Sequence, residues 1–191
     1  MDGLMSTFAD PPRQVAWRHK DLREGFEVVF IEPRWTVEGA TTAVEDGAAF
    51  AVQYAIDLTP DWVTRGARVA SFGREVQLLA DGDGRWLVDG VAVPSLDGVF
   101  DVDLESSSFT NAFPVHRLAL AVGETADAPA AWVRRDTLAV ERLEQRYTRL
   151  PDDADGRSRF DYWSPDLSCE LLYDEFGLVL DYPGIAERAA V

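Results

Sequence analysis

The chain has 191 residues, 47% of them hydrophobic and 27% charged, a balance typical of one soluble globular domain rather than a disordered or fibrous protein. Its 18 lysine and arginine residues against 34 aspartate and glutamate residues give a formal net charge of −16. Because such a charge repels phosphate backbones and anionic lipid surfaces at long range, we expect no nucleic-acid partner.

Turn-forming sequences interrupt the chain roughly every 8 to 16 residues, and this rhythm favours many short strands joined by hairpins. Between the turns lie segments rich in residues that favour β-structure. The predicted strands, in chain order, are residues 26–31, 35–44, 49–56, 68–72, 76–80, 86–93, 99–104, 115–122, 159–163, 167–173 and 178–182. The sequence therefore predicts a mainly β protein.

One segment, residues 138–150, fits two structures. Leu143, Tyr147 and Leu150 fit a helical stripe, whereas Val140 and Thr148 favour a strand. Periodicity alone does not decide between them.

The N-terminal residues 1–14 have neither a basic region nor an apolar run, so they do not form a secretory signal and are expected to be flexible. No later stretch reaches the ~18 consecutive apolar residues of a membrane-spanning helix. A single cysteine, Cys169, suits a reducing compartment, and we therefore expect a cytoplasmic protein.

Motifs for familiar catalytic chemistry do not match. His19 and His116 are the only histidines in the sequence, and no nucleophile elbow accompanies either. Residues 81–84 resemble the start of a calcium loop, but Arg85 stands where such a loop needs an oxygen ligand. We therefore assign no catalytic residue, no metal and no cofactor.

Asp101 and Asp103 stand two residues apart in a predicted strand, so their carboxylates should lie on one face, about 7 Å apart. Pairs of carboxylates at similar separations cleave glycosidic bonds, although such pairs normally come from different strands. Ordinary polar alternation on a half-exposed strand is the favoured interpretation. Acceptance of hydrogen bonds from sugar hydroxyls remains a further alternative.

Aromatic and arginine residues supply the remaining candidates. Most of the six tryptophans should be core, and Trp62, Trp86 and Trp132 are the candidates for cavity or sugar-stacking walls. Five arginines and three acids leave residues 134–149 at a net charge of +2. This stretch offers donors to an anionic or polyhydroxyl head group, or it balances surrounding carboxylates, which is the favoured interpretation.

The sequence Asp-Val-Asp-Leu at 101–104, followed by Ser-Ser-Phe-Thr-Asn-Ala-Phe-Pro-Val-His-Arg-Leu at 107–118, resembles the signature of the putative glycolipid-binding protein family, which is bacterial and functionally uncharacterised. Blocks at 25–27, 83–90, 145–148 and 177–184 resemble it as well. His116 departs from the family's usual arginine. The resemblance spans residues 15–188 and implies one domain, a strongly curved, largely antiparallel sheet in a barrel-like body, and a strand at 138–150.

Because polar residues concentrate in these family-like blocks and no catalytic triad or metal set appears, our first hypothesis is a non-enzymatic protein that shelters the apolar tail of a glycolipid or other amphiphile in a barrel cavity and holds its polar head group at the rim. The predicted rim and wall residues are Asp101, Asp103, Thr110, Asn111, His116, Arg117, Arg146, Tyr147, Trp62, Trp86 and Trp132. Two alternatives are a hydrolase that acts on a sugar-containing small molecule through Asp101 or Asp103 with His116, and a scaffold protein whose barrel is filled.

Overall fold

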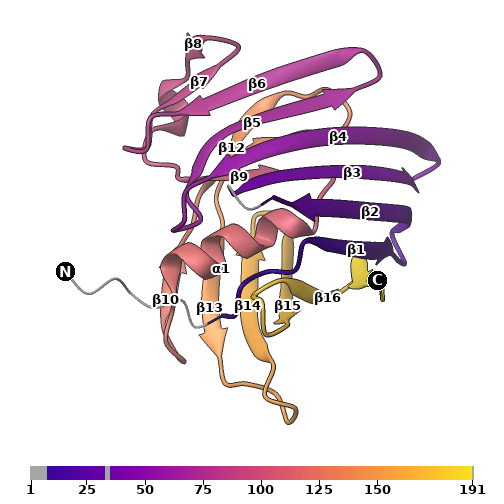
Figure 1. The fold of residues 1–191 in the computed structure, drawn as a ribbon, viewed down its shortest axis with the longest axis vertical. Coiled ribbons are helices and arrows are strands. Elements are labelled where there is room, and N and C mark those ends of the chain that lie inside the picture. Colours follow the sequence, from indigo (N-terminus) through magenta and orange to yellow (C-terminus); the bar gives the residue numbers. More distant parts are fainter. Residues whose placement is uncertain (1–7, 33–34, 191) are drawn as a thin grey trace.

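The computed structural model describes residues 8–32 and 35–190, and most of this chain is β-structure (Figure 1). The N-terminal strands are β1 (Gln14–His19), β2 (Arg23–Ile31), β3 (Thr36–Glu45), β4 (Ala48–Leu58), β5 (Thr64–Ser71), β6 (Arg74–Ala80), β7 (Trp86–Val88) and β8 (Val91–Ala92). The middle of the chain forms the 3₁₀ turn η1 (Pro94–Leu96), β9 (Asp101–Leu104), the 3₁₀ turn η2 (Phe109–Asn111) and the helix α1 (Ala112–Leu118). The C-terminal strands are β10 (Thr125–Asp127), β11 (Ala130–Val133), β12 (Val140–Leu143), β13 (Arg146–Leu150), β14 (Ser158–Ser164), β15 (Leu167–Tyr173), β16 (Val179–Tyr182) and β17 (Ala186–Arg188).

Fourteen of these strands form one antiparallel sheet, in the order β10-β13-β14-β15-β16-β17-β1-β2-β3-β4-β5-β6-β7-β8. The first strand of the chain pairs with the last, so β1 and β17 join the N-terminal and C-terminal halves of the sheet. The sheet stays open, because its edge strands β10 and β8 do not pair with each other. A second, 3-stranded sheet has the order β12-β11-β9, and its β11–β9 pair is parallel. The predicted mainly β, largely antiparallel single domain is confirmed.

Side chains alternate between the two faces of the long strands. In β4, every second residue from Phe50 to Leu58 is buried, as a half-covered strand requires. Gly39 of β3 lies directly under the Tyr54 ring: a Cβ atom at Gly39 would lie 2.2 Å from Tyr54 Cζ. The glycine therefore lets the Tyr54 side chain lie flat across β3 and reach β2.

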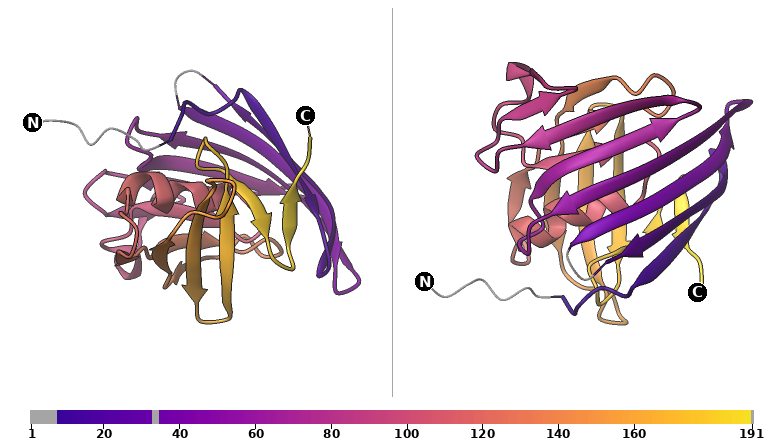
Figure 2. Two further views of the ribbon diagram at one scale, coloured as in Figure 1. Left: turned by 90° about the horizontal axis from the view of Figure 1, so that it is seen from below. Right: turned by 45° about the horizontal axis from the view of Figure 1, so that its top comes forward.

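The helix α1 and the turn η2 cover the concave side of the bent sheet, next to strands of both halves (Figures 1 and 2). Phe109 and Phe113 are fully buried there and pack edge to face, with ring centroids 5.6 Å apart. Phe109 also contacts Trp17 of β1, at 6.1 Å, and Phe113 contacts Trp62, at 6.2 Å. Aromatic side chains therefore fill the region where the resemblance implies space for an acyl tail.

Three predicted strands need correction. Residues 115–122 are not a strand, because α1 ends at Leu118 and Ala119 terminates it in the left-handed conformation. Residues 86–93 form the hairpin β7–β8, which turns at Asp89 and Gly90, both with positive φ. Residues 138–150 contain two strands, β12 and β13, which belong to different sheets.

The structure describes part of the N-terminal segment 1–14, which was predicted to be flexible. Residues 1–7 lie outside the described residues, and Gln14 already belongs to β1. Between them, the Ala9 backbone N–H donates to the Glu175 carbonyl at 2.9 Å. Within the described residues, we find no helix with the length and apolar character needed to span a bilayer.

Candidate functional site

A pocket of about 190 Å³ lies where the second sheet meets the large one, and it collects side chains from distant parts of the chain. Its lining residues are Arg23, Glu45, Asp103, Leu104, Glu105, Ser107, Asn111, Trp132, Leu143, Tyr162, Ser164, Asp166, Leu167, Tyr182 and Ile185. The set includes carboxylates, an amide and three aromatic rings. Of the predicted site residues, the pocket brings together Asp103, Asn111 and Trp132.

Asp103 lies near the end of β9, and its carboxylate accepts hydrogen bonds from two neutral side chains. Thr110 Oγ1 donates to Asp103 Oδ1 at 2.6 Å, and Gln145 Nε2 donates to Asp103 Oδ2 at 2.7 Å. Burial raises the pKa of the Asp103 carboxyl above its ordinary value; these two hydrogen bonds oppose the rise, and the nearby Asp101 adds to it. Thr110, a predicted rim residue, therefore positions Asp103 rather than lining the pocket.

Asp101, two residues earlier on β9, is bound by Arg117 of α1. The Arg117 guanidinium makes a two-pronged contact with the carboxylate, at 3.0 and 2.6 Å. The exposed fractions of the side chains are 2% for Asp101 and 17% for Arg117. The two predicted rim residues therefore form an ion pair that joins β9 to α1, and Asp101 is not free to act together with Asp103.

Asn111, a lining residue of the pocket, has an unpaired polar atom. The residue is 4% exposed, and its side-chain Oδ1 has no hydrogen-bond partner among the described residues. The Asn111 backbone carbonyl accepts a hydrogen bond from Tyr173 Oη at 3.2 Å. An unpaired buried carbonyl costs about 1–3 kcal/mol, so a donor brought by a ligand would recover that energy.

A cluster of four tyrosines adjoins the pocket, one from each of β13, β14, β15 and β16, and two of them, Tyr162 and Tyr182, line it. Its members are Tyr147, Tyr162, Tyr173 and Tyr182, all buried. The Tyr162 ring contacts Tyr147 at 5.2 Å and Tyr182 at 6.3 Å between centroids. Burial raises the pKa of each hydroxyl, so the cluster stays neutral. Tyr147, a predicted rim residue, is fully buried in this cluster.

The other half-buried carboxylates of the lining already have cationic partners. Arg23 Nε donates to Glu45 Oε2 at 2.7 Å, and Arg135 bonds the same oxygen. Burial raises the pKa of Glu45, but the two arginines lower it more, so the net shift is downward. Arg134 lies 3.3 Å from Glu105 Oε2.

Comparisons with known proteins agree with this architecture and give a family. The family model described as "Putative glycolipid-binding" matches residues 14–188. The chain belongs to this family. Its fold is similar to the crystal structure of a DUF1089 family protein from Pseudomonas aeruginosa, with a TM-score of 0.67 and 32% sequence identity over 99% of this chain and 97% of that chain. No curated protein matches the chain.

In this member of the glycolipid-binding family, a buried acid that sequence analysis did not single out bonds the lining residue Ser107. Glu27 of β2 accepts hydrogen bonds from Tyr54 Oη at 2.6 Å, from the Ser108 backbone N–H at 2.7 Å and from Ser107 Oγ. Burial raises the pKa of Glu27. Glu27 stands in the family-like block at 25–27, but only the fold brings Glu27 and Tyr54 to the segment that carries Asn111.

His116 lies outside the pocket lining, and its contacts are with the protein's own aromatic and backbone groups. Its ring stacks on Trp62, with centroids 3.7 Å apart and planes 7° from parallel. Nε2 lies 3.0 Å from the Phe176 carbonyl, and burial lowers the pKa of the imidazole to about 4. His116 of α1 and Trp62, which were both predicted as ligand-binding residues, therefore pack against each other.

The last two predicted residues lie elsewhere. Trp86 is 2% exposed, and its Nε1 donates to the Val99 carbonyl at 2.9 Å. It lines a separate pocket of about 490 Å³ beside β6–β8. Arg146 lies on the surface and pairs with Asp127 at 2.7 Å.

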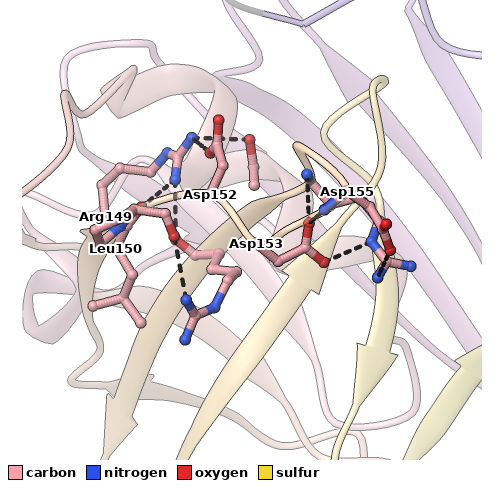
Figure 3. A network of polar contacts seen from close by, with 9 residues as sticks. Arg149, Leu150, Asp152, Asp153 and Asp155 are labelled. Carbon is pink, nitrogen blue, oxygen red and sulfur yellow. Dashed lines mark hydrogen bonds and ion pairs between the residues drawn. The ribbon is translucent and has the colours of Figure 1, made fainter.

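The arginines of residues 134–149 are all engaged by nearby acids or carbonyls. Figure 3 shows one end of this region, where Arg149 bonds Asp152 and the Leu150 carbonyl. In the same hairpin, Asp153 accepts hydrogen bonds from the Asp155 backbone N–H and from Arg157 (Figure 3). The interpretation of this stretch as a face that balances neighbouring carboxylates is confirmed.

Proposed function

We propose that this protein binds a glycolipid or a related amphiphile without converting it, and that the polar head group enters the pocket formed around Asp103 and Asn111. The unpaired Asn111 Oδ1 carries the proposal, because a buried carbonyl without a donor is stabilised when a ligand hydroxyl supplies one. Asp103 offers a second acceptor in the same pocket. Trp132 adds an aromatic ring against which the apolar face of a sugar can pack.

The size of the pocket limits what it can hold. Sites for drug-sized ligands typically enclose about 300–1,000 Å³, whereas this pocket encloses about 190 Å³. It therefore suits a head group such as one sugar ring rather than a whole glycolipid. The aromatic packing beneath α1 further argues against a tail buried in the core.

Half-buried apolar residues of the lining offer the tail a binding surface outside the core. Leu143, Leu167 and Ile185 belong to the lining and remain partly accessible to solvent. An alkyl chain that leaves the pocket across them gains about 0.8 kcal/mol for each methylene that it buries. This arrangement keeps the head group at a rim, as the sequence predicted, and moves the tail from the interior to the surface.

Binding is favoured over hydrolysis by the state of the predicted acid–base residues. Asp101 is occupied by Arg117, and His116 is stacked on Trp62 outside the lining. Asp103 thus lacks the partners that the hydrolase hypothesis gave it. A search for turnover of aryl glycosides by the purified protein tests this part of the proposal, and hydrolysis that Asp103→Asn abolishes would contradict it.

Isothermal titration calorimetry with octyl glucoside, below its micelle concentration, tests the binding. We expect Trp132→Ala to weaken affinity about tenfold, because it removes a stacking surface worth roughly 1–1.5 kcal/mol. Trp163→Ala is the matched control, because Trp163 is 43% exposed and lies outside the lining. Absence of binding by the unmodified protein, or an equal loss in both variants, would refute the proposed site.

A further inference from the structure

The charges around the pocket are unevenly balanced. Glu45 is paired with Arg23 and Arg135, and Glu105 is paired with Arg134. The half-buried carboxylate of Asp103 differs from these two, because among the described residues it accepts side-chain hydrogen bonds from neutral donors alone. Its own side of the pocket therefore lacks a counter-charge.

Two side chains of the lining, Asp103 and Asn111, offer oxygen atoms that can accept further hydrogen bonds. Asn111 Oδ1 has no partner, and the Asp103 carboxylate has lone pairs beyond the two hydrogen bonds that it accepts. Tyr162 Oη lies 3.1 Å from Gln145 Nε2, from which it accepts a hydrogen bond. A ligand that carries several donors and a positive charge complements this arrangement, since a protonated amine has three N–H donors and no acceptor.

An anionic head group fits the same surface poorly. Arg23 is committed to Glu45 and to the Glu105 carbonyl. A phosphate or sulfate would therefore meet the Asp103 carboxylate without an unpaired cation in the lining to receive it. The chain's net charge of −16 adds to the repulsion.

We propose that the head group of the ligand is an amino sugar with a free, protonated amine, and that this ammonium is held between Asp103 and Asn111 Oδ1. The inference rests on the proposed head-group pocket. It narrows the ligand class from any neutral glycolipid to one whose sugar is not N-acylated. A buried carboxylate and a buried carbonyl would both gain a donor in a single contact.

Three octyl glycosides test the inference by calorimetry at neutral pH and moderate salt: the glucoside, the glucosaminide and the N-acetylglucosaminide. We expect the glucosaminide to bind about tenfold more tightly than the other two, because a charge-assisted hydrogen bond is about twice as strong as a neutral one. Asp103→Asn should reduce this preference to less than about twofold. Asp161→Asn is the matched control, because Asp161 is an exposed carboxylate of β14 outside the lining and the variant should retain the preference.

The outcomes separate the inference from the proposed function. Equal binding of all three glycosides would overturn the inference and leave the head-group pocket standing. A preference for the amine that survives Asp103→Asn would also overturn it, because the attraction would then come from the net charge. Failure of all three glycosides to bind would refute the proposed function itself. The comparison of ligands on the unmodified protein stands even where a variant does not fold.

Discussion

The buried imidazole of His116 makes a quantitative prediction about stability and pH. Its pKa falls from an ordinary 6.5 to about 4 in the folded protein. The unfolded chain therefore binds a proton at this residue between these pH values while the folded chain does not, and stability is lost as pH falls through that window. Between pH 7.5 and pH 5 the loss attributable to His116 is about 2 kcal/mol.

His116→Gln isolates this contribution. The glutamine has no titrating group and keeps an amide donor for the Phe176 carbonyl. Urea unfolding of both proteins should give a free-energy difference, unmodified minus variant, that decreases by about 2 kcal/mol between pH 7.5 and pH 5. Other groups, including His19, whose pKa is also lowered to about 4, cancel in the difference.

The pH dependence is the decisive part of the measurement. Loss of the stack on Trp62 lowers the stability of the variant at every pH and therefore shifts the whole difference without changing its slope. A difference that stays constant within about 0.5 kcal/mol over this range would refute the reasoning. It would mean that the folded protein protonates His116 as easily as the unfolded chain does.

Three further changes test other parts of the structure. Arg117→Met should cost about 3–5 kcal/mol by leaving the Asp101 carboxylate buried and unpaired, and adding Asp101→Asn should restore much of that loss in urea unfolding. Gly39→Ala should destabilise the protein by more than the ~1–3 kcal/mol of ordinary overpacking, since the new Cβ would lie 2.2 Å from Tyr54 Cζ, and Tyr54→Ala should partly rescue it. Asn111→Ala should change stability by less than about 1 kcal/mol, because removal of the unpaired Oδ1 offsets the loss of packing, yet weaken octyl glucoside binding several-fold; a large drop in stability with unchanged binding would contradict the head-group role.

Much of the fold could be predicted because strand signals are local. Alternation and turn residues located β3, β4, β14 and β15 closely, since a strand with one buried face carries its own pattern. Residues 115–122 were predicted wrongly for the opposite reason. Val115 and its neighbours favour a strand by residue type. In the fold, however, Phe109 and Phe113 pack against Trp17 and Trp62, and the segment buries these two phenylalanines as a 3₁₀ turn followed by a helix.

The candidate site was predictable in part. Asp103, Asn111 and Trp132 were found in polar and aromatic segments of the sequence, and all three line the pocket. His116 and Trp62 were chosen for the same chemical reasons, but their rings stack on each other outside this lining. Trp86 lines a separate pocket. Residue type indicates what a side chain can bind, whereas burial and contacts decide whether a ligand can reach it.

The sequence alone determined the strand-rich class, the net negative charge and membership of the family, because composition, alternation and motif spacing can be read without knowing which distant residues meet. Tertiary structure alone decided that Asp101 is paired with Arg117 while Asp103, two residues away, is left without a cation. It also decided that Glu27 meets Ser107, which is 80 residues away along the chain. Such assignments depend on which distant strands become neighbours, and the energies that choose those neighbours are sums over the whole core.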